Sequence, residues 1–207
     1  MKYDYIIVGA GSAGCVLANR LSADPSNQVL LLEAGGSDRH PYIHIPGAYV
    51  KLHRSKMDWG YWTAPQKHLN NRKIYLPRGK VLGGCSSTNA MAYVRGNKED
   101  YNDWAKLGNS SWSYEAILPY FKRAEHNVQF QNAYHGTAGE LHVGHGAFQT
   151  PYSGAFIDAC VACGIPANPD CNGASQTGAG RFQFTIKNGK RYSGVDAFLR
   201  PAMSRKN

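Results

Sequence analysis

The chain has 207 residues, enough to bury a sizeable core in one large domain or two small ones. Its formal net charge is +9, but the 23 Lys and Arg residues are dispersed, so the composition gives no support for nucleic-acid binding. Five cysteines, an odd number, argue against a disulfide framework. No stretch approaches the ~20 apolar residues of a membrane span, and the N-terminus lacks the apolar core of a signal peptide. A reducing cytoplasm is therefore the expected location.

A β-α-β unit is predicted at the N-terminus. Residues 3–8 are rich in β-branched and aromatic side chains, and we expect them to form a buried strand. Apolar residues recur at helical spacing from Ser12 to Ser22, and Pro25 ends that helix. Residues 28–33 form a second apolar run, which we expect to be another buried strand. Two strands and a helix within about 30 residues imply a parallel pair with a right-handed crossover.

The rest of the chain shows shorter elements. From residue 37 to residue 77 it is irregular, and we expect its aromatic side chains, Trp59, Tyr61 and Trp62, to be buried. Beyond this segment, capping and stop signals predict further elements. They are a helix from Asn97 to Leu107, a helix from Ser113 to about Glu125 with Pro119 inside it, a strand at 139–143, a helix from Pro151 to Cys163, a strand at 182–186 followed by an Asn188-Gly189 turn, and a helix at 193–203.

The first glycine-rich turn fits the pattern G-x-G-x-x-G through Gly9, Gly11 and Gly14. Gly9 would permit a tight turn, Gly11 would let a pyrophosphate approach the backbone, and Gly14 would let helix and strand pack closely. The helix N-terminus favours phosphates. Glu33, which ends the second strand, can accept hydrogen bonds from ribose hydroxyls and would repel the 2′-phosphate of NADP. The pattern does not separate FAD from NAD, and a glycine-rich turn without a nucleotide is the structural alternative.

A second loop rich in glycine and serine runs from Arg78 to Met91. Its free backbone amides and hydroxyls could lie against a polar ring system and face the ring oxygens and nitrogens. From the residues alone, a surface loop without a ligand is an equal alternative.

This second loop resembles the first signature of the glucose–methanol–choline (GMC) oxidoreductases, Gly-Lys-x-Leu-Gly-Gly followed by Ser-x-x-Asn, which Gly79–Asn89 supplies. The resemblance covers nearly the whole chain, and it looks most like the choline and alcohol dehydrogenases of the family. The other similar segments, in chain order, are Gly9–Gly14, Glu33–Gly36, Asp58–Tyr61, Tyr93–Gly96, Gly108-Asn109, Trp112–Tyr114, His135-Gly136, Gln183–Thr185 and Gly189–Ser193.

The resemblance implies an α/β fold: an incomplete Rossmann-like FAD-binding domain over residues 1–144 and the start of an α+β substrate domain over 145–207, with a return segment. It implies FAD as the cofactor. Thr88 stands where some relatives carry a His that bonds the flavin, so we expect the FAD to be non-covalent. The implied contacts are Gly9, Gly11, Ser12, Ala13 and Gly14 at the pyrophosphate, Glu33 at the ribose with Ala34 beside it, Val81, Gly83 and Gly84 along the cofactor, and Asn89, Ala90, Met91 and Ala92 beside the isoalloxazine.

For activity, the resemblance implies hydride transfer from an alcohol substrate to the flavin, and an electron acceptor as the second partner. The family's catalytic base, a His paired with a His or Asn, lies towards the C-terminus of full-length members, so no catalytic residue is assigned in this chain. The alternative is a non-catalytic FAD-binding fragment or a degenerate truncated product. No metal site is expected, because Cys160 and Cys163 fall late in a predicted helix and the eight His lack metal-ligand spacing. Each His is expected to be a surface or packing residue.

Overall fold

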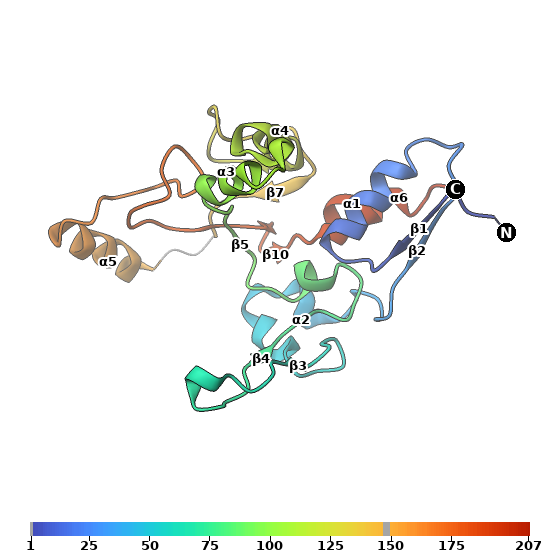
Figure 1. Cartoon of the computed structure of the whole chain (residues 1–207), viewed down its shortest axis with the longest axis horizontal. Coiled ribbons are helices and arrows are strands. Elements are labelled where there is room, and N and C mark those ends of the chain that lie inside the picture. The colour runs from blue at the N-terminus through green and yellow to red at the C-terminus, as the bar shows by residue number, and fades with distance from the viewer. Residues whose placement is uncertain (1, 147–149) are drawn as a thin grey trace. The chain divides into compact units, whose positions relative to one another are not determined.

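The computed structural model describes residues 2–146 and 150–207, which fall into two compact units (Figure 1). The first unit comprises Met1–Met91 and Lys190–Asn207, and the second comprises Ala92–Gly189. Residues 147–149, which belong to the predicted part 145–207, lie outside the described residues. The functional division of the chain at residue 144 stays a prediction.

The first unit begins with the predicted β-α-β arrangement. Strand β1 (Tyr5–Val8) is followed by helix α1 (Ser12–Leu21) and strand β2 (Val29–Leu32). The strands pair in parallel, with Tyr5 opposite Val29 at one end and Val8 opposite Leu32 at the other. The predicted parallel pair is confirmed, and the amide of Gly9 extends it by donating to the carbonyl of Leu32 at 2.8 Å.

The C-terminal segment returns to this unit and packs on α1 (Figure 1). It contains a π-helical turn, Val195–Leu199, and helix α6 (Arg200–Ala202), and the Asn19 amide donates to the Phe198 carbonyl at 2.7 Å. The helix predicted at 193–203 is therefore present but partly π-helical. Pro201 lacks an amide, and its ring would clash with the carbonyl four residues earlier in a regular α-helix. The wider π turn just before it relieves that conflict.

Two burial predictions for the first unit are wrong. Neither predicted strand is buried as a whole: Ile7 is buried, but Val8 is 84% and Leu32 45% exposed, because β1 and β2 make a sheet of only two strands within residues 2–146 and 150–207. Trp59, Tyr61 and Trp62 are also about half exposed. Trp59 and Tyr61 stack on each other with ring centroids 5.8 Å apart, so they shield one another instead of entering a core.

Short elements complete the first unit. One buried cluster among them is formed by Ile43, Leu52, Met57 and Val81. The elements are α2 (Pro41–His44), 3₁₀ helices at Pro46–Leu52, Lys67–Leu69 and Gly84–Ser87, an antiparallel pair of β3 (Tyr61–Trp62) and β4 (Tyr75–Leu76), and β10 (Lys190–Arg191).

Over its described residues, 92–146 and 150–189, the second unit combines three α-helices with short strands. In chain order it holds β5 (Ala92–Tyr93), α3 (Lys98–Lys106), a 3₁₀ turn at Ser110–Trp112, α4 (Tyr114–Ala124), β6 (Glu125–Asn127), β7 (Leu141–Val143), α5 (Pro151–Ala162), β8 (Gln183–Phe184) and β9 (Ile186–Lys187). Strands β6 and β7 pair in parallel, and β5 and β8 pair antiparallel. The strand predicted at 182–186 is thus divided into β8 and β9.

The predicted helix caps of the second unit are confirmed. The side chain of Asn97 accepts from the Glu99 amide at 3.0 Å, and that of Ser113 accepts from the Ala116 amide at 3.3 Å. Gly108 and Gly164, which follow α3 and α5, have φ values of +102° and +85°, typical of helix C-termini. Within residues 2–146 and 150–207, no helix combines the length and apolar character that crossing a membrane requires.

Candidate functional site

The turn between β1 and α1 has the geometry that its glycines predict. Gly9 has a φ of +98°, a left-handed conformation that favours glycine, which confirms its role in the tight turn. A Cβ at Gly14 would overlap the carbonyl oxygen of Gly9, so only glycine lets α1 pass this close to the end of β1. At Gly11 a Cβ would meet nothing within 4 Å, so space lies open in front of this backbone.

The N-terminus of α1 is open to a ligand. Its N-cap is Gly11, which has no capping side chain, and its first turn holds no acidic residue. The free amides and the positive end of the helix dipole therefore favour an anion such as a phosphate. Glu33 lies beside this turn: one carboxylate oxygen accepts from the Ala10 amide at 2.8 Å and the other from the Gly35 amide at 2.8 Å. These bonds fix the carboxylate and leave it further lone pairs for hydroxyl donors.

The second glycine loop packs directly on the first. The Gly83 amide donates to the Ala10 carbonyl at 2.7 Å. Gly84 has a φ of +51°, and a Cβ there would lie 2.8 Å from the Cα of Gly11. The missing side chains at these positions therefore allow two backbone loops to meet, and a ligand on one loop would also touch the other.

A cleft of about 960 Å³ opens where the two loops meet. This volume suits a ligand of dinucleotide size. Six of the predicted site residues line it: Gly9, Gly11, Ser12, Glu33, Ala34 and Gly84. The stacked pair Trp59 and Tyr61, together with Arg78 and Cys85, also lines it. An adjoining hollow of about 630 Å³ is lined by two more, Ala13 and Gly14.

The remaining predicted residues lie elsewhere. Val81 is fully buried in the cluster with Ile43, so its side chain does not line the cleft. Gly83 is buried where the loops touch. Asn89 and Ala90 are exposed beyond the 3₁₀ turn Gly84–Ser87, and Met91 is buried. Ala92 begins the second unit. The cofactor contacts of all these residues remain predictions.

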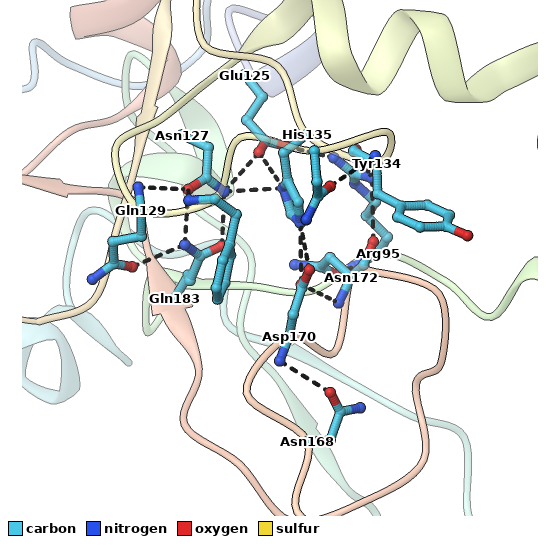
Figure 2. Close-up of polar contacts among 12 residues, drawn as sticks. Arg95, Glu125, Asn127, Gln129, Tyr134, His135, Asn168, Asp170, Asn172 and Gln183 are labelled. Carbon is cyan, nitrogen blue, oxygen red and sulfur yellow. Dashed lines mark hydrogen bonds and ion pairs between the residues drawn. The ribbon is translucent and has the colours of Figure 1, made fainter.

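The second unit contains a buried network of charged side chains that sequence reasoning did not find (Figure 2). Arg95 forms an ion pair with Glu125, and both side chains are almost completely buried. His135 lies between two carboxylates: its Nδ1 is 2.6 Å from Glu125 Oε1, and its Nε2 is 2.9 Å from Asp170 Oδ2. Figure 2 shows Asn127 closing the network, with its amide nitrogen 2.7 Å from Glu125 Oε1.

This network favours a charged imidazole. A carboxylate can only accept hydrogen bonds, so protons on both ring nitrogens of His135 satisfy Glu125 and Asp170, while the Asn127 amide nitrogen, a donor, also lies 3.0 Å from Nδ1. Burial alone would lower the pKa of His135, but the hydrogen bonds and charges of Glu125 and Asp170 outweigh it and raise that pKa. Burial would likewise raise the pKa of Glu125, but His135, Asn127 and Arg95 together lower it. Two cations thus face two anions, and the charges balance inside the unit.

His135 is expected from the sequence to be a surface or packing residue, and the structure places it among the buried residues, where it binds two carboxylates. Its partners stand 10 and 35 residues away in sequence, where no periodic pattern could reveal them. The network lies away from open solvent and holds together β6 and the loops around residues 135 and 170, so its geometry indicates a structural role. In the described ranges, 2–146 and 150–207, no group of three or more His, Cys, Asp or Glu side chains could hold a metal ion.

A parallel β-α-β unit with a glycine-rich turn and an open helix N-terminus is the architecture of the dinucleotide-binding domains of oxidoreductases. The comparison with known families agrees: the family model described as GMC oxidoreductase matches residues 3–207. The chain belongs to the GMC oxidoreductase family. The resemblance found in the sequence and the predicted α/β fold are therefore confirmed.

Among curated relatives, the chain is 48% identical to an oxygen-dependent choline dehydrogenase of Rhizobium etli (strain CIAT 652), over 100% of this chain and 38% of the relative. It is 51% identical to an alcohol dehydrogenase (acceptor) of Pseudomonas putida, over 99% of this chain and 38% of the relative. The chain thus spans about 38% of the length of these two oxidoreductases.

Solved structures share the fold. A pyridoxine 4-oxidase from Mesorbium loti superposes with a TM-score of 0.94 at 35% identity, over 99% of this chain and 41% of that chain. An FAD-dependent oxidoreductase from Chaetomium thermophilum superposes with a TM-score of 0.90 at 32% identity, over 99% of this chain and 37% of that chain.

Proposed function

We propose that the first unit binds FAD across the meeting point of its two glycine loops. The open N-terminus of α1 carries the proposal, because its uncapped amides face a cleft large enough for a dinucleotide. Gly9, Gly11, Ser12 and Ala13 would hold the pyrophosphate, with Gly14 bringing the helix close. The Glu33 carboxylate would accept from the ribose hydroxyls beside Ala34. The name of the Chaetomium relative, an FAD-dependent oxidoreductase, supports FAD over NAD.

The segment Val81–Ala92 would serve the ring system of the same cofactor. Val81, Gly83 and Gly84 would run along it, offering backbone rather than side chains. Asn89, Ala90, Met91 and Ala92 would lie beside the isoalloxazine. Thr88 is buried and offers no nucleophile like the His that bonds the flavin in some relatives, so the FAD is held without a covalent bond. Acid precipitation of the loaded protein should therefore leave a colourless pellet.

The reaction served by this site is the oxidation of an alcohol to a carbonyl compound. Bound FAD supplies the acceptor for the hydride of the alcohol carbon. The residues of this chain bind and orient the cofactor, and the proton of the alcohol is assigned to no residue among them. The choline and alcohol dehydrogenases among the relatives support an alcohol substrate and a separate electron acceptor for the enzyme to which these residues contribute.

Titration of the purified chain with FAD, followed by flavin fluorescence, tests the proposal. Glu33→Ala should weaken binding by roughly 1–3 kcal/mol, because ribose hydroxyls and two loop amides lose their acceptor. Glu33→Gln keeps one acceptor oxygen, so its affinity for FAD should lie between the affinities of the wild type and Glu33→Ala. Glu115→Ala, an exposed carboxylate in the second unit, is the matched control. Equal affinity for FAD in the wild type, Glu33→Ala and Glu115→Ala would contradict the role of Glu33 at the ribose. No binding of FAD by the wild type would overturn the proposal as a whole.

A further inference from the structure

Arg191, in β10, is a buried cation at the base of the second glycine loop. The residue is 2% exposed. Its guanidinium makes four hydrogen bonds, and every acceptor is an uncharged oxygen. They are the Ile43 carbonyl at 2.7 Å, the Ser86 carbonyl at 3.1 Å, the Asn89 side-chain oxygen at 2.7 Å and the Asn89 carbonyl at 2.7 Å.

These bonds hold the loop in an unusual conformation. The Asn89 side-chain oxygen that accepts from Arg191 also accepts from the Met91 amide at 3.0 Å. Met91 has a φ of +63°, a left-handed conformation that is strained for a residue other than glycine. Such strain persists only where surrounding bonds determine it. Arg191 and the Met91 amide thus share the Asn89 side-chain oxygen, so Arg191 is placed to hold this part of the loop.

The charge of Arg191 is not neutralised by an ion pair in the described part of the chain. The nearest acid by its electrostatic effect is Asp196, whose carboxylate binds Ser193 at 3.0 Å and Arg200 at 3.3 Å. Burial lowers the pKa of Arg191 to about 10, which leaves the side chain charged at neutral pH. A buried cation without a partner acid is costly, so its retention points to a task for the charge itself.

We propose that Arg191 is a positioning residue that fixes the loop Gly83–Met91 and sets a buried positive charge behind it, towards the cofactor that the loop binds. The inference rests on the proposed function, because it names what the loop does for the same site. A positive charge behind the loop favours the reduced cofactor when that form carries negative charge, and so raises its reduction potential. Fixing the loop also lowers the ordering cost of binding.

The first test needs no cofactor. Hydrogen exchange of the amides in residues 83–91 should be about tenfold faster in Arg191→Gln than in the wild type, while exchange in α1 stays unchanged. Arg200→Gln, which removes a half-exposed arginine of the same unit, should leave the loop unchanged. Equal loop exchange in wild type and Arg191→Gln would overturn the proposal. If Arg191→Gln unfolds α1 as well, Arg191→Lys decides: fast exchange confined to the loop supports the proposal, and uniform fast exchange overturns it.

The second test separates charge from structure. In FAD-loaded protein, the midpoint potential measured against a reference dye should fall in Arg191→Gln and stay near the wild-type value in Arg191→Lys, which keeps the charge but not the planar fork. Equal midpoint potentials in the wild type, Arg191→Gln and Arg191→Lys would overturn the claim that the charge of Arg191 raises the reduction potential. Failure of the wild type to bind FAD would instead overturn the proposed function, while the exchange measurement would still decide whether Arg191 fixes the loop.

Discussion

In the part of the chain that the structure describes, each unit buries one arginine, and the two are satisfied in opposite ways. Arg95 in the second unit pairs with Glu125 inside a network whose charges balance. Arg191 in the first unit donates only to uncharged oxygens. A balanced network fixes structure and leaves little net field, whereas an unbalanced cation leaves a field for a ligand to use. If the proposal for Arg191 holds, the buried charges of the second unit serve its structure alone, whereas that of the first unit also serves a bound cofactor.

The largest expected effect comes from breaking the balanced network. Arg95→Met should lower the free energy of unfolding by about 3–5 kcal/mol, because Glu125 would be left as a buried anion short of its partner. Urea denaturation measures the loss. Asp103→Asn, which breaks the exposed pair with Lys106, is the control and should change stability little. If Arg95→Met lowered the free energy of unfolding no more than Asp103→Asn does, the ion pair between Arg95 and Glu125 would not be stabilising.

Arg191→Met should lower the free energy of unfolding by less, about 1–3 kcal/mol. The substitution leaves carbonyl groups unpaired, but it leaves no buried opposite charge without a partner. The same denaturation experiment compares the two arginines directly. A loss from Arg191→Met that exceeded that from Arg95→Met would contradict the contrast drawn between balanced and unbalanced charge.

A smaller effect concerns pH. The pKa of His135 is raised in the folded chain, so its contribution is complete below its ordinary value of 6.5 and is lost as pH rises through the raised pKa. The pKa of Glu125 is lowered, so its contribution is complete above 4.5 and is lost as pH falls through the lowered pKa. The stability difference between wild type and His135→Gln should therefore be largest between pH 4.5 and 6.5 and shrink above it. A difference that grew with pH would show that His135 is neutral when folded.

The smallest expected effect is the loss of one neutral hydrogen bond in the second unit, which gives a reference for the larger losses. Ser113→Ala removes the N-cap of α4 and should cost about 1 kcal/mol. Ser110→Ala, at an exposed position of the preceding turn, should cost almost nothing. If the cap mutation matched Arg95→Met, the network would be worth no more than a single capping bond.

Local signals predicted much of this fold. The β-α-β unit follows from two apolar runs around a helical spacing, and the caps at Asn97 and Ser113 follow from residues whose side chains reach their own helix. The tight turn at Gly9 and the close packing at Gly14 were also predictable, because each depends on a missing side chain. These features share one property: every group involved lies within a few residues of its partner or within the same β-α-β unit.

The features that sequence reasoning missed depend on distant partners. Arg191 binds groups that are 102 to 148 residues away, and no spacing rule links them. The exposure of Trp59 and Tyr61 was missed for a related reason, because two aromatic rings can shield each other without entering a core. Burial of an individual side chain depends on the final arrangement of all elements, which composition and periodicity do not contain.

The division of the chain has a consequence for its synthesis. The second unit, Ala92–Gly189, is continuous, whereas the first needs both the opening residues and Lys190–Asn207. On the ribosome the continuous unit has all of its residues available before Lys190–Asn207 emerges. During that interval helix α1 lacks the Val195–Leu199 turn on which it packs, and it lacks the hydrogen bond from the Asn19 side-chain amide to the Phe198 carbonyl. Helix α1, whose N-terminus lines the glycine cleft, therefore gains its packing partner only after the residues of the balanced network have all been made.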